Sequence, residues 1–174
     1  MTRLKPASSD PVDARAHLWE LIKEIRFAMF TTRHHNGHLH SRPMTTQNSG
    51  IDEDMSLWFF MSRASDPVDE LTHDPIVNLV YADPDEDTYV SISATARVVE
   101  NTQKKSELWS NFAEAWFPAG VNDADLALVQ VTITHANYWD VTESKIVQLF
   151  HMAKAIVTGK RTTNLGEHAE IRMD

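Results

Sequence analysis

Hydrophobic and polar residues alternate along two long segments of the chain, and this is the pattern of half-buried β-strands. In the segment 89–99 the apolar positions are Val90, Ile92, Ala94, Ala96 and Val98. In the segment 128–141 the alternation runs through Val129, Val131 and Ile133. Each segment is therefore predicted to be a long strand with one face in the core.

Shorter stretches add further strands to this prediction. Residues 57–61 form an aromatic run and residues 76–81 a β-branched run, each bounded by Asp, Pro or Ser. The segments 27–32 and 38–47 are predicted to pair, because the Asn-Gly dipeptide at 36–37 accepts the positive φ angles of a tight hairpin turn. About six strands in hairpin or meander order favour an antiparallel barrel, whose closure leaves no unpaired edge.

Helices are predicted at two Asp-Pro pairs, where Asp can serve as the N-cap and Pro can take the first helical position. Asp10-Pro11 begins an amphipathic helix over residues 11–26, and Asp66-Pro67 begins a shorter one. Residues 102–127 should hold one or two short helices, interrupted by the aromatic loop Trp116–Gly120. These helices would flank the barrel.

The last part of the chain divides into a helical stripe and a tail. After Thr142, apolar residues recur at helical spacing until Gly159, which is expected to end the helix. The tail 160–174 has no such stripe and is predicted to be irregular. We therefore expect one mainly β domain of the α+β class over residues 1–174, with its core at about 11–158: a six-stranded antiparallel barrel with flanking helices.

Composition and charge narrow the function classes. The 174-residue chain has no cysteine, which excludes disulfides, thiol catalysis and Cys-ligated metal centres. Its formal net charge of −9 opposes binding to nucleic acid, which depends on clustered Lys and Arg. No apolar run is long enough to span a bilayer, and the N-terminal sequence lacks the apolar stretch of a signal peptide. We therefore expect a cytoplasmic protein with no membrane or nucleic-acid partner.

Four histidines gather around the predicted hairpin: His34, His35, His38 and His40. Imidazole is the commonest metal ligand, and one of these side chains could also bind a haem iron axially. However, the chain has no cysteine, and no carboxylate stands at a convincing ligand spacing from these histidines. The sequence therefore favours a solvated hairpin tip, and no metal site is predicted.

One face of the predicted strand 38–47 carries a candidate ligand-binding residue. Alternation places Arg42 and Met44 on one face, and an Arg side chain can hold a phosphate or carboxylate through two hydrogen bonds. Pro43 gives up a ladder hydrogen bond, so this strand is expected at a sheet edge or a bulge. An Arg beside a free strand edge suits a planar heteroaromatic ligand. No side chain stands out as a general acid or base, so no catalytic residue is assigned.

Several motifs in register extend this picture. They are Ser41-Arg42-Pro43-Met44, Leu57 to Ser65, Tyr89-Val90-Ser91-Ile92-Ser93, Ala115 to Gly120, Tyr138-Trp139-Asp140 and Lys145 to Phe150. In this order and at these spacings, over about residues 13–168, they resemble the general stress protein family of the pyridoxamine-phosphate-oxidase-like, flavin-binding split barrels. The resemblance implies a split β-barrel fold and a flavin mononucleotide (FMN) cofactor.

The resemblance also implies a homodimer with two FMN sites at the subunit interface, each built by both chains. The residues that would bind the cofactor are Arg42, Pro43, Met44, Thr45, Gln47, Phe60, Met61, Ser62 and Ser65, with the partner's Trp139 and the partner's Lys145. Arg42 would lie along the isoalloxazine and ribityl groups, Ser65 would contact the phosphate, and the loop Trp116–Gly120 would shape access to the flavin.

Two positions depart from the pattern of the family. Where relatives commonly carry a lysine that binds the FMN phosphate, this chain has Pro67, and where the oxidases carry a substrate-binding histidine it has Val147. The first removes one charge-assisted contact, and the second argues against pyridoxamine-phosphate oxidation itself. The leading hypothesis is an FMN-dependent oxidoreductase. The alternatives are a flavin-binding storage or stress module without turnover, a haem-binding split barrel, and a barrel whose pocket binds nothing strongly.

Overall fold

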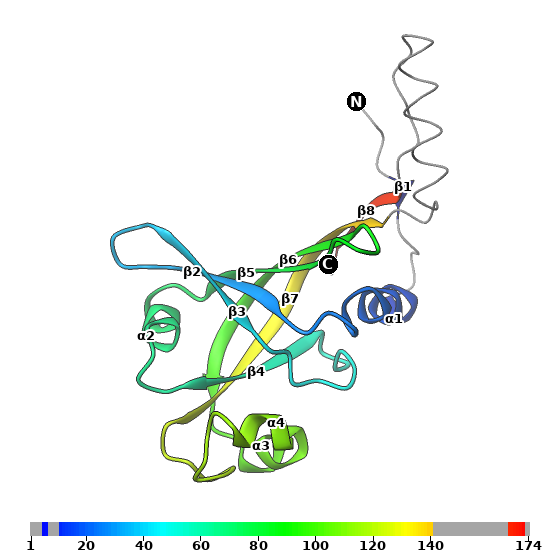
Figure 1. Cartoon of the computed structure of the whole chain (residues 1–174). Helices are drawn as coiled ribbons and strands as arrows, with labels where there is room; N and C mark the ends of the chain where they lie inside the picture. The colour runs from blue at the N-terminus through cyan, green and yellow to red at the C-terminus, as the bar shows by residue number, and fades with distance from the viewer. Residues whose placement is uncertain (1–4, 7–10, 141–166, 173–174) are drawn as a thin grey trace, which may run out of the picture.

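The computed structural model describes residues 5–6, 11–140 and 167–172, which form one curled sheet with flanking helices (Figure 1). The strands of the barrel are β2 (Ala28–Arg33), β3 (Leu39–Met44), β4 (Ser56–Ser62), β5 (Ile76–Asp83), β6 (Thr88–Val99) and β7 (Leu126–Asp140). Two further strands, β1 (Lys5–Pro6) and β8 (Glu167–Arg172), extend the sheet beside β7.

The barrel strands pair antiparallel in the order β4-β7-β6-β5-β2-β3. The two ends of this series meet at an antiparallel bridge between Thr46 and Phe59, next to a 2.9 Å hydrogen bond from Gln47 N–H to Trp58 O. The sheet thus closes over a short contact between β3 and β4, which is the geometry of a split barrel. The predicted fold class is confirmed: a six-stranded antiparallel split β-barrel with flanking helices.

The hairpin and the edge strand lie where the sequence predicted them. Gly37 has a φ of +86°, and its N–H donates to His34 O at 2.8 Å in the turn between β2 and β3. β3 is the last strand of the main pairing path, so Pro43 stands on an edge strand.

The end of the chain differs from its prediction. Residues 167–172, predicted as part of an irregular tail, form β8, which pairs with His135–Asp140 of β7. β1 in turn pairs in parallel with β8. The first half of β7 pairs with β4, and the second half extends beyond β4. The edge of that second half is therefore open to β8, in which the apolar residues Ala169 and Ile171 alternate with polar ones. The helix predicted between Thr142 and Gly159 lies outside the described residues.

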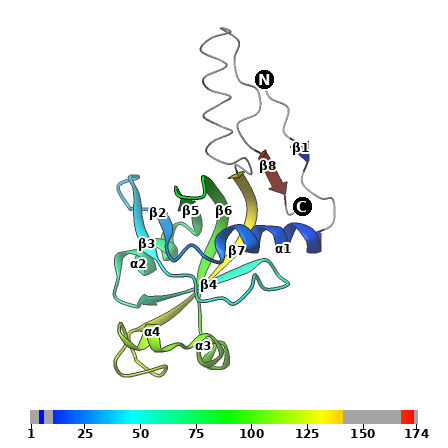
Figure 2. The ribbon, with the colours of Figure 1, turned by 45° about the vertical axis from the view of Figure 1, so that its right-hand side comes forward.

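The helices in the described part of the chain are α1 (Pro11–Ile22), α2 (Asp66–His73), α3 (Thr102–Leu108) and α4 (Asn111–Glu114). α1 ends at Ile22 rather than at residue 26, because Ile25 N–H turns back to Ile22 O at 3.0 Å before the chain enters β2. None of these helices is long and apolar enough to cross a membrane. Figures 1 and 2 place α2 beside the β2–β3 hairpin, and α3 and α4 together near β4.

The barrel interior is the main hydrophobic core, and β4 is buried on both of its faces. Leu57, Phe59 and Met61 face the barrel core, whereas Trp58 and Phe60 belong to a second apolar cluster on the outside of the sheet. Residues of α4 and of the loop after it complete that second cluster. The sequence of β4 is therefore a continuous apolar run rather than an alternating one.

Candidate functional site

A cleft of about 400 Å³ opens where the edge strand β3 meets the end of β4. The start of α2 and the segment from α4 to Phe117 form its other walls. The cleft gathers residues that the sequence analysis had grouped from separate motifs: Arg42, Pro43, Met44, Thr45, Gln47, Phe60, Met61, Ser62 and Ser65. The closure of the barrel between β3 and β4 is what brings these motifs together.

One wall of the cleft is aromatic. Phe60 and Phe117 are buried members of the second apolar cluster, whereas Trp116 is 74% exposed at the mouth of the cleft. The loop after Trp116 turns at Gly120, which has a φ of +82° and donates its N–H to Phe117 O at 2.9 Å. A buried apolar wall with one exposed ring beside it suits a flat aromatic ligand.

The turn from β4 into α2 forms a polar part of the cleft. Ser65 is the N-cap of α2, but its hydroxyl donates to Ser62 O at 2.6 Å and caps no N–H group of the helix. Pro67 is buried and contributes neither an N–H donor nor a charge. The Ser65 hydroxyl proton is therefore already donated within the protein, and this part of the cleft presents few free donors to a ligand.

Asp125 places a carboxylate in the same cleft. Its Oδ1 accepts Ala64 N–H at 3.2 Å. A hydrogen bond with the Ser62 side chain, followed by that of the Ala64 amide, holds the pKa of Asp125 below its usual value. The carboxylate is therefore ionised at neutral pH, and it opposes an anionic ligand near Ser62.

Arg42 lines the cleft but is committed to a buried acid. Its Nη1 donates to Thr32 Oγ1 at 2.7 Å, and both Nη1 and Nη2 lie 3.2 Å from Glu70 Oε2. Glu70 is 1% exposed, and Thr32 also donates to its Oε2. Burial opposes ionisation of Glu70, but the hydrogen bonds from Thr32 and Arg42 and the charge of Arg42 outweigh it and lower the pKa of Glu70. The positive charge of Arg42 is thus already paired within the protein.

Two residues that were predicted to contact the cofactor from the partner chain are not among the described residues of this cleft. Trp139 lies on β7, opposite Tyr89 of β6, and is 43% exposed. In the described part of the chain it does not line the cleft. Lys145 lies outside the described residues. The contacts of both residues with a cofactor stay predictions.

The cleft also contains residues that the sequence analysis missed: Arg26, Phe27, Phe112, Ala113 and Asp125. The Arg26 guanidinium lies 4.9 Å from the centre of the Phe27 ring and 4.5 Å from that of Phe112, and so joins the segment just before β2 to α4. No local motif marks these positions, because they meet through tertiary packing across more than half of the chain.

The histidines of the hairpin lie away from this site. Among the described residues that line the cleft there is no histidine. The cleft therefore offers a haem iron no axial imidazole from the described residues, and the haem-binding alternative stays a prediction.

Comparison with known proteins adds a family relationship to this geometry. Residues 13–163 match the family model described as pyridoxamine 5'-phosphate oxidase like. Among curated proteins, Protein bli-3 of Neurospora crassa is 26% identical over 166 residues, covering 88% of this chain and 78% of that protein.

Solved structures share the fold over most of their length. The general stress FMN/FAD binding protein from Xanthomonas citri is 27% identical with a TM-score of 0.63, and the match covers 75% of this chain and 90% of that one. A protein from Jannaschia sp. CCS1, assigned as general stress protein 26, is 24% identical with a TM-score of 0.72, covering 93% of this chain and 99% of that one.

Proposed function

This chain belongs to the pyridoxamine 5'-phosphate oxidase-like family, and from that premise we propose that its cleft binds FMN and that the protein is a flavin-dependent oxidoreductase of the cytoplasm. One observation carries the proposal. The cleft unites, from β3, β4 and the start of α2, the positions at which the family resemblance expects the cofactor. The Xanthomonas citri relative, described as an FMN/FAD binding protein, supports the same cofactor class.

The residues of the cleft fit the isoalloxazine ring of FMN better than they fit its phosphate. A volume of about 400 Å³ lies within the range of small-molecule sites, and the aromatic wall suits the isoalloxazine ring. At the turn into α2, the hydroxyl protons of Ser65 and Ser62 are already donated to Ser62 O and to the Asp125 carboxylate, Asp125 repels a phosphate, and Pro67 cannot donate. We therefore expect the ring to supply most of the affinity and the phosphate to supply little.

Bound FMN would supply the transfer of a hydride or of electrons to and from a small-molecule substrate. The protein's own part is to bind the ring, to orient it and to limit access of water. Phe60 and Phe117 form a dry wall, and Trp116 stands at the mouth, where it can pack on a ring that enters. Arg42 is held by Glu70, so its guanidinium edge presents hydrogen-bond donors in a fixed place.

The proposal predicts saturable FMN binding that depends on Trp116. Because an aromatic pair contributes about 0.5–1.5 kcal/mol beyond its buried area, Trp116→Ala should weaken FMN binding roughly three- to tenfold. The measurement is quenching of FMN fluorescence on titration with purified protein. Leu39→Ala is the matched control, since Leu39 is 65% exposed on β3 but does not line the cleft. A wild-type protein that leaves FMN fluorescence unchanged at high micromolar concentration would contradict the proposal.

Turnover separates an oxidoreductase from a flavin-binding storage or stress module. We expect the FMN-loaded protein to oxidise reduced nicotinamides, or to be reduced by another donor, in the presence of an artificial electron acceptor. FMN binding with no reduction by any donor of such a panel would favour the module without turnover.

We also propose that two chains form a homodimer with FMN at the interface. Trp116 and Trp139 both expose large aromatic surface, Phe27 adds exposed apolar surface in the cleft, and Met29 of β2 is exposed as well. Trp139 is too far along β7 to line the cleft of its own chain, so a contact with FMN requires a second copy. Sedimentation velocity at micromolar concentration should show a dimer. A monomer would remove the interfacial site while leaving the cleft of one chain intact.

A further inference from the structure

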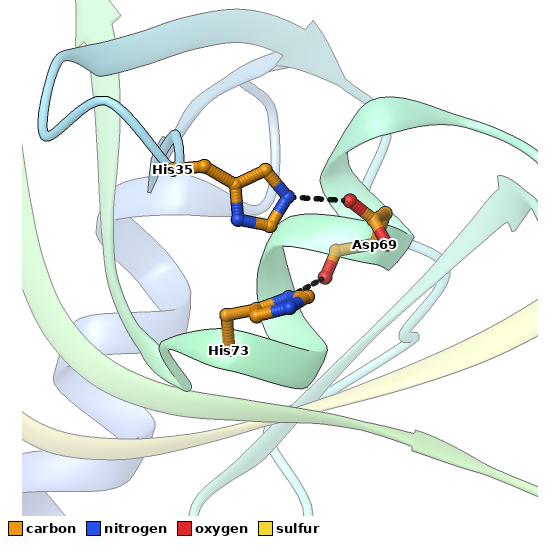
Figure 3. A group of neighbouring side chains, drawn as sticks. All are labelled: His35, Asp69 and His73. Carbon is orange, nitrogen blue, oxygen red and sulfur yellow. Dashed lines mark hydrogen bonds and ion pairs between the residues drawn. The ribbon is translucent and has the colours of Figure 1, made fainter.

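A cluster of metal-ligating side chains lies on the outer surface, where the β2–β3 hairpin meets α2. His35 belongs to the hairpin, and Asp69 and His73 belong to α2 (Figure 3). Ligand atoms of these three residues all lie within 4.8 Å of one another. Asp69 and His73 are four residues apart, so they occupy one face of the helix.

The hydrogen bonds of the cluster leave donor atoms suited to a metal. His73 Nδ1 lies 3.0 Å from the Asp69 carbonyl oxygen, which can only accept, so this contact assigns the N–H to Nδ1, and Nε2 is the ring nitrogen available to a metal. His35 Nε2 lies 2.7 Å from Asp69 Oδ2.

A simple surface ion pair accounts for His35 and Asp69 but not for the position of the His73 ring beside them. The His35 and His73 rings meet edge to face with their centres 4.2 Å apart. His34 packs on His35 at 5.5 Å and on His40 at 4.9 Å, and His40 Nδ1 in turn lies 3.3 Å from Glu70 Oε1. A cation shared by His35, Asp69 and His73 would hold the two imidazoles together beside the carboxylate.

We propose that His35, Asp69 and His73 bind a divalent transition-metal ion, with Zn²⁺ as the expected occupant. Two imidazoles and one carboxylate are a donor set that Zn²⁺ accepts in tetrahedral geometry, with water at the fourth position. Tetrahedral ligands at about 2.1 Å from zinc lie about 3.4 Å apart, and exposed side chains can close the remaining distance by rotamer changes. Zinc takes the place of the proton that His35 Nε2 shares with Asp69: a neutral His35 ring carries a proton on Nδ1 instead, and a protonated ring releases the Nε2 proton to solvent.

Metal binding at this site would fasten the hairpin to α2. Both elements also contribute to the Arg42–Glu70 pair, because β3 carries Arg42 and α2 carries Glu70. The site lies outside the cleft, and the inference does not depend on FMN binding.

The test is titration of the full-length protein with Zn²⁺ by calorimetry, after removal of metals with a chelator, and with Co²⁺ by visible absorption. We expect one zinc ion per chain, the intense d–d absorption of tetrahedral Co²⁺, and a higher melting temperature with zinc. His73→Ala and Asp69→Asn should each weaken zinc binding at least about tenfold, since even changes outside the ligand set commonly cost about 10–100-fold. All three ligands are exposed, so both variants should fold.

His38→Ala is the matched control, because His38 is exposed on the same hairpin and is not among the clustered ligands. It should bind zinc as tightly as the wild-type protein. Three results would overturn the proposal: no zinc binding by the wild-type chain, equal binding by the wild-type and His73→Ala proteins, or the weak spectrum of six-coordinate Co²⁺.

Discussion

Arg42→Ala should destabilise the protein by about 3–5 kcal/mol, because it leaves the buried carboxylate of Glu70 without its charged partner. Glu70 is 1% exposed, and its Oε2 accepts from both Thr32 and Arg42. Its Oε1 makes no hydrogen bond within the described residues, although His40 Nδ1 lies 3.3 Å away. Urea denaturation followed by circular dichroism measures the change in the free energy of unfolding.

The second variant Glu70→Gln separates loss of the ion pair from loss of packing. In the Arg42→Ala background, Glu70→Gln removes the unpaired charge and should recover a large part of the lost stability. An Arg42→Ala penalty below about 1 kcal/mol, or a double variant no more stable than Arg42→Ala, would show that the pair is of little energetic importance.

The same pair predicts how the penalty depends on pH. The pKa of Glu70 is lowered in the folded wild-type protein, so its contribution to stability is present above the unfolded value of about 4.3 and is lost as pH falls through the folded pKa. In Arg42→Ala the buried carboxyl lacks its cation and takes up a proton more readily. The difference between the two proteins should therefore shrink as the pH falls below about 4.

Because Arg42 also stabilises Glu70, Arg42→Ala is not a clean test of cofactor binding. A loss of FMN binding in that variant could follow from a disturbed β3 rather than from a missing ligand contact. Trp116→Ala avoids the difficulty, because Trp116 is 74% exposed and its removal leaves no buried group unpaired.

The sequence predicted the parts of the fold whose signals are local. The alternation of β6 reappears as burial of Val90, Ile92, Ala94 and Ala96. The Asn-Gly turn requires a positive φ that Gly37 adopts without steric cost. A strand, a turn and an edge proline are each decided within a few residues, so a single sequence is enough to place them.

Contacts between distant elements could not be predicted in the same way. Glu70 and Asp69 stand in a short acidic helix, where carboxylates are normally solvated, yet one is buried against Arg42 and the other meets His35. No carboxylate lies near the histidines in the linear sequence. In the fold one does, because α2 packs beside the hairpin and brings Asp69 to His35. β8 was missed for a related reason: the long β7 strand provides its pairing partner.

The cleft contains residues of both kinds: some are marked by motifs in the sequence, and others are brought in only by tertiary packing. Its β3 and β4 walls were grouped by motifs that the family resemblance joined, and the barrel closure between Thr46 and Phe59 accounts for their meeting. Arg26 and Asp125 carry no motif and enter the cleft through tertiary packing alone. The carboxylate of Asp125 matters most among these, because it sets the charge that a phosphate would meet.

Pro67→Lys should tighten FMN binding about ten- to hundredfold, since a hydrogen bond to a charged group contributes about 1.5–3 kcal/mol. Pro67 lines the cleft beside Ser65, at the turn where the phosphate is expected and where Asp125 now supplies a negative charge. A lysine there would place an ammonium group opposite that phosphate. The dissociation constant for FMN is measured by the fluorescence titration described above.

Two comparisons isolate the charge. Pro67→Met has a side chain of similar reach and the same backbone N–H as Pro67→Lys but no ammonium group, so it should bind FMN more weakly than Pro67→Lys does. Riboflavin lacks the phosphate, and its affinity should be the same for Pro67→Lys and Pro67→Met. If lysine and methionine at this position gave equal FMN affinity, or if lysine tightened riboflavin as much as FMN, the phosphate would lie elsewhere. The flavin would then enter the cleft in another orientation, with its ring against the aromatic wall and its ribityl phosphate away from α2.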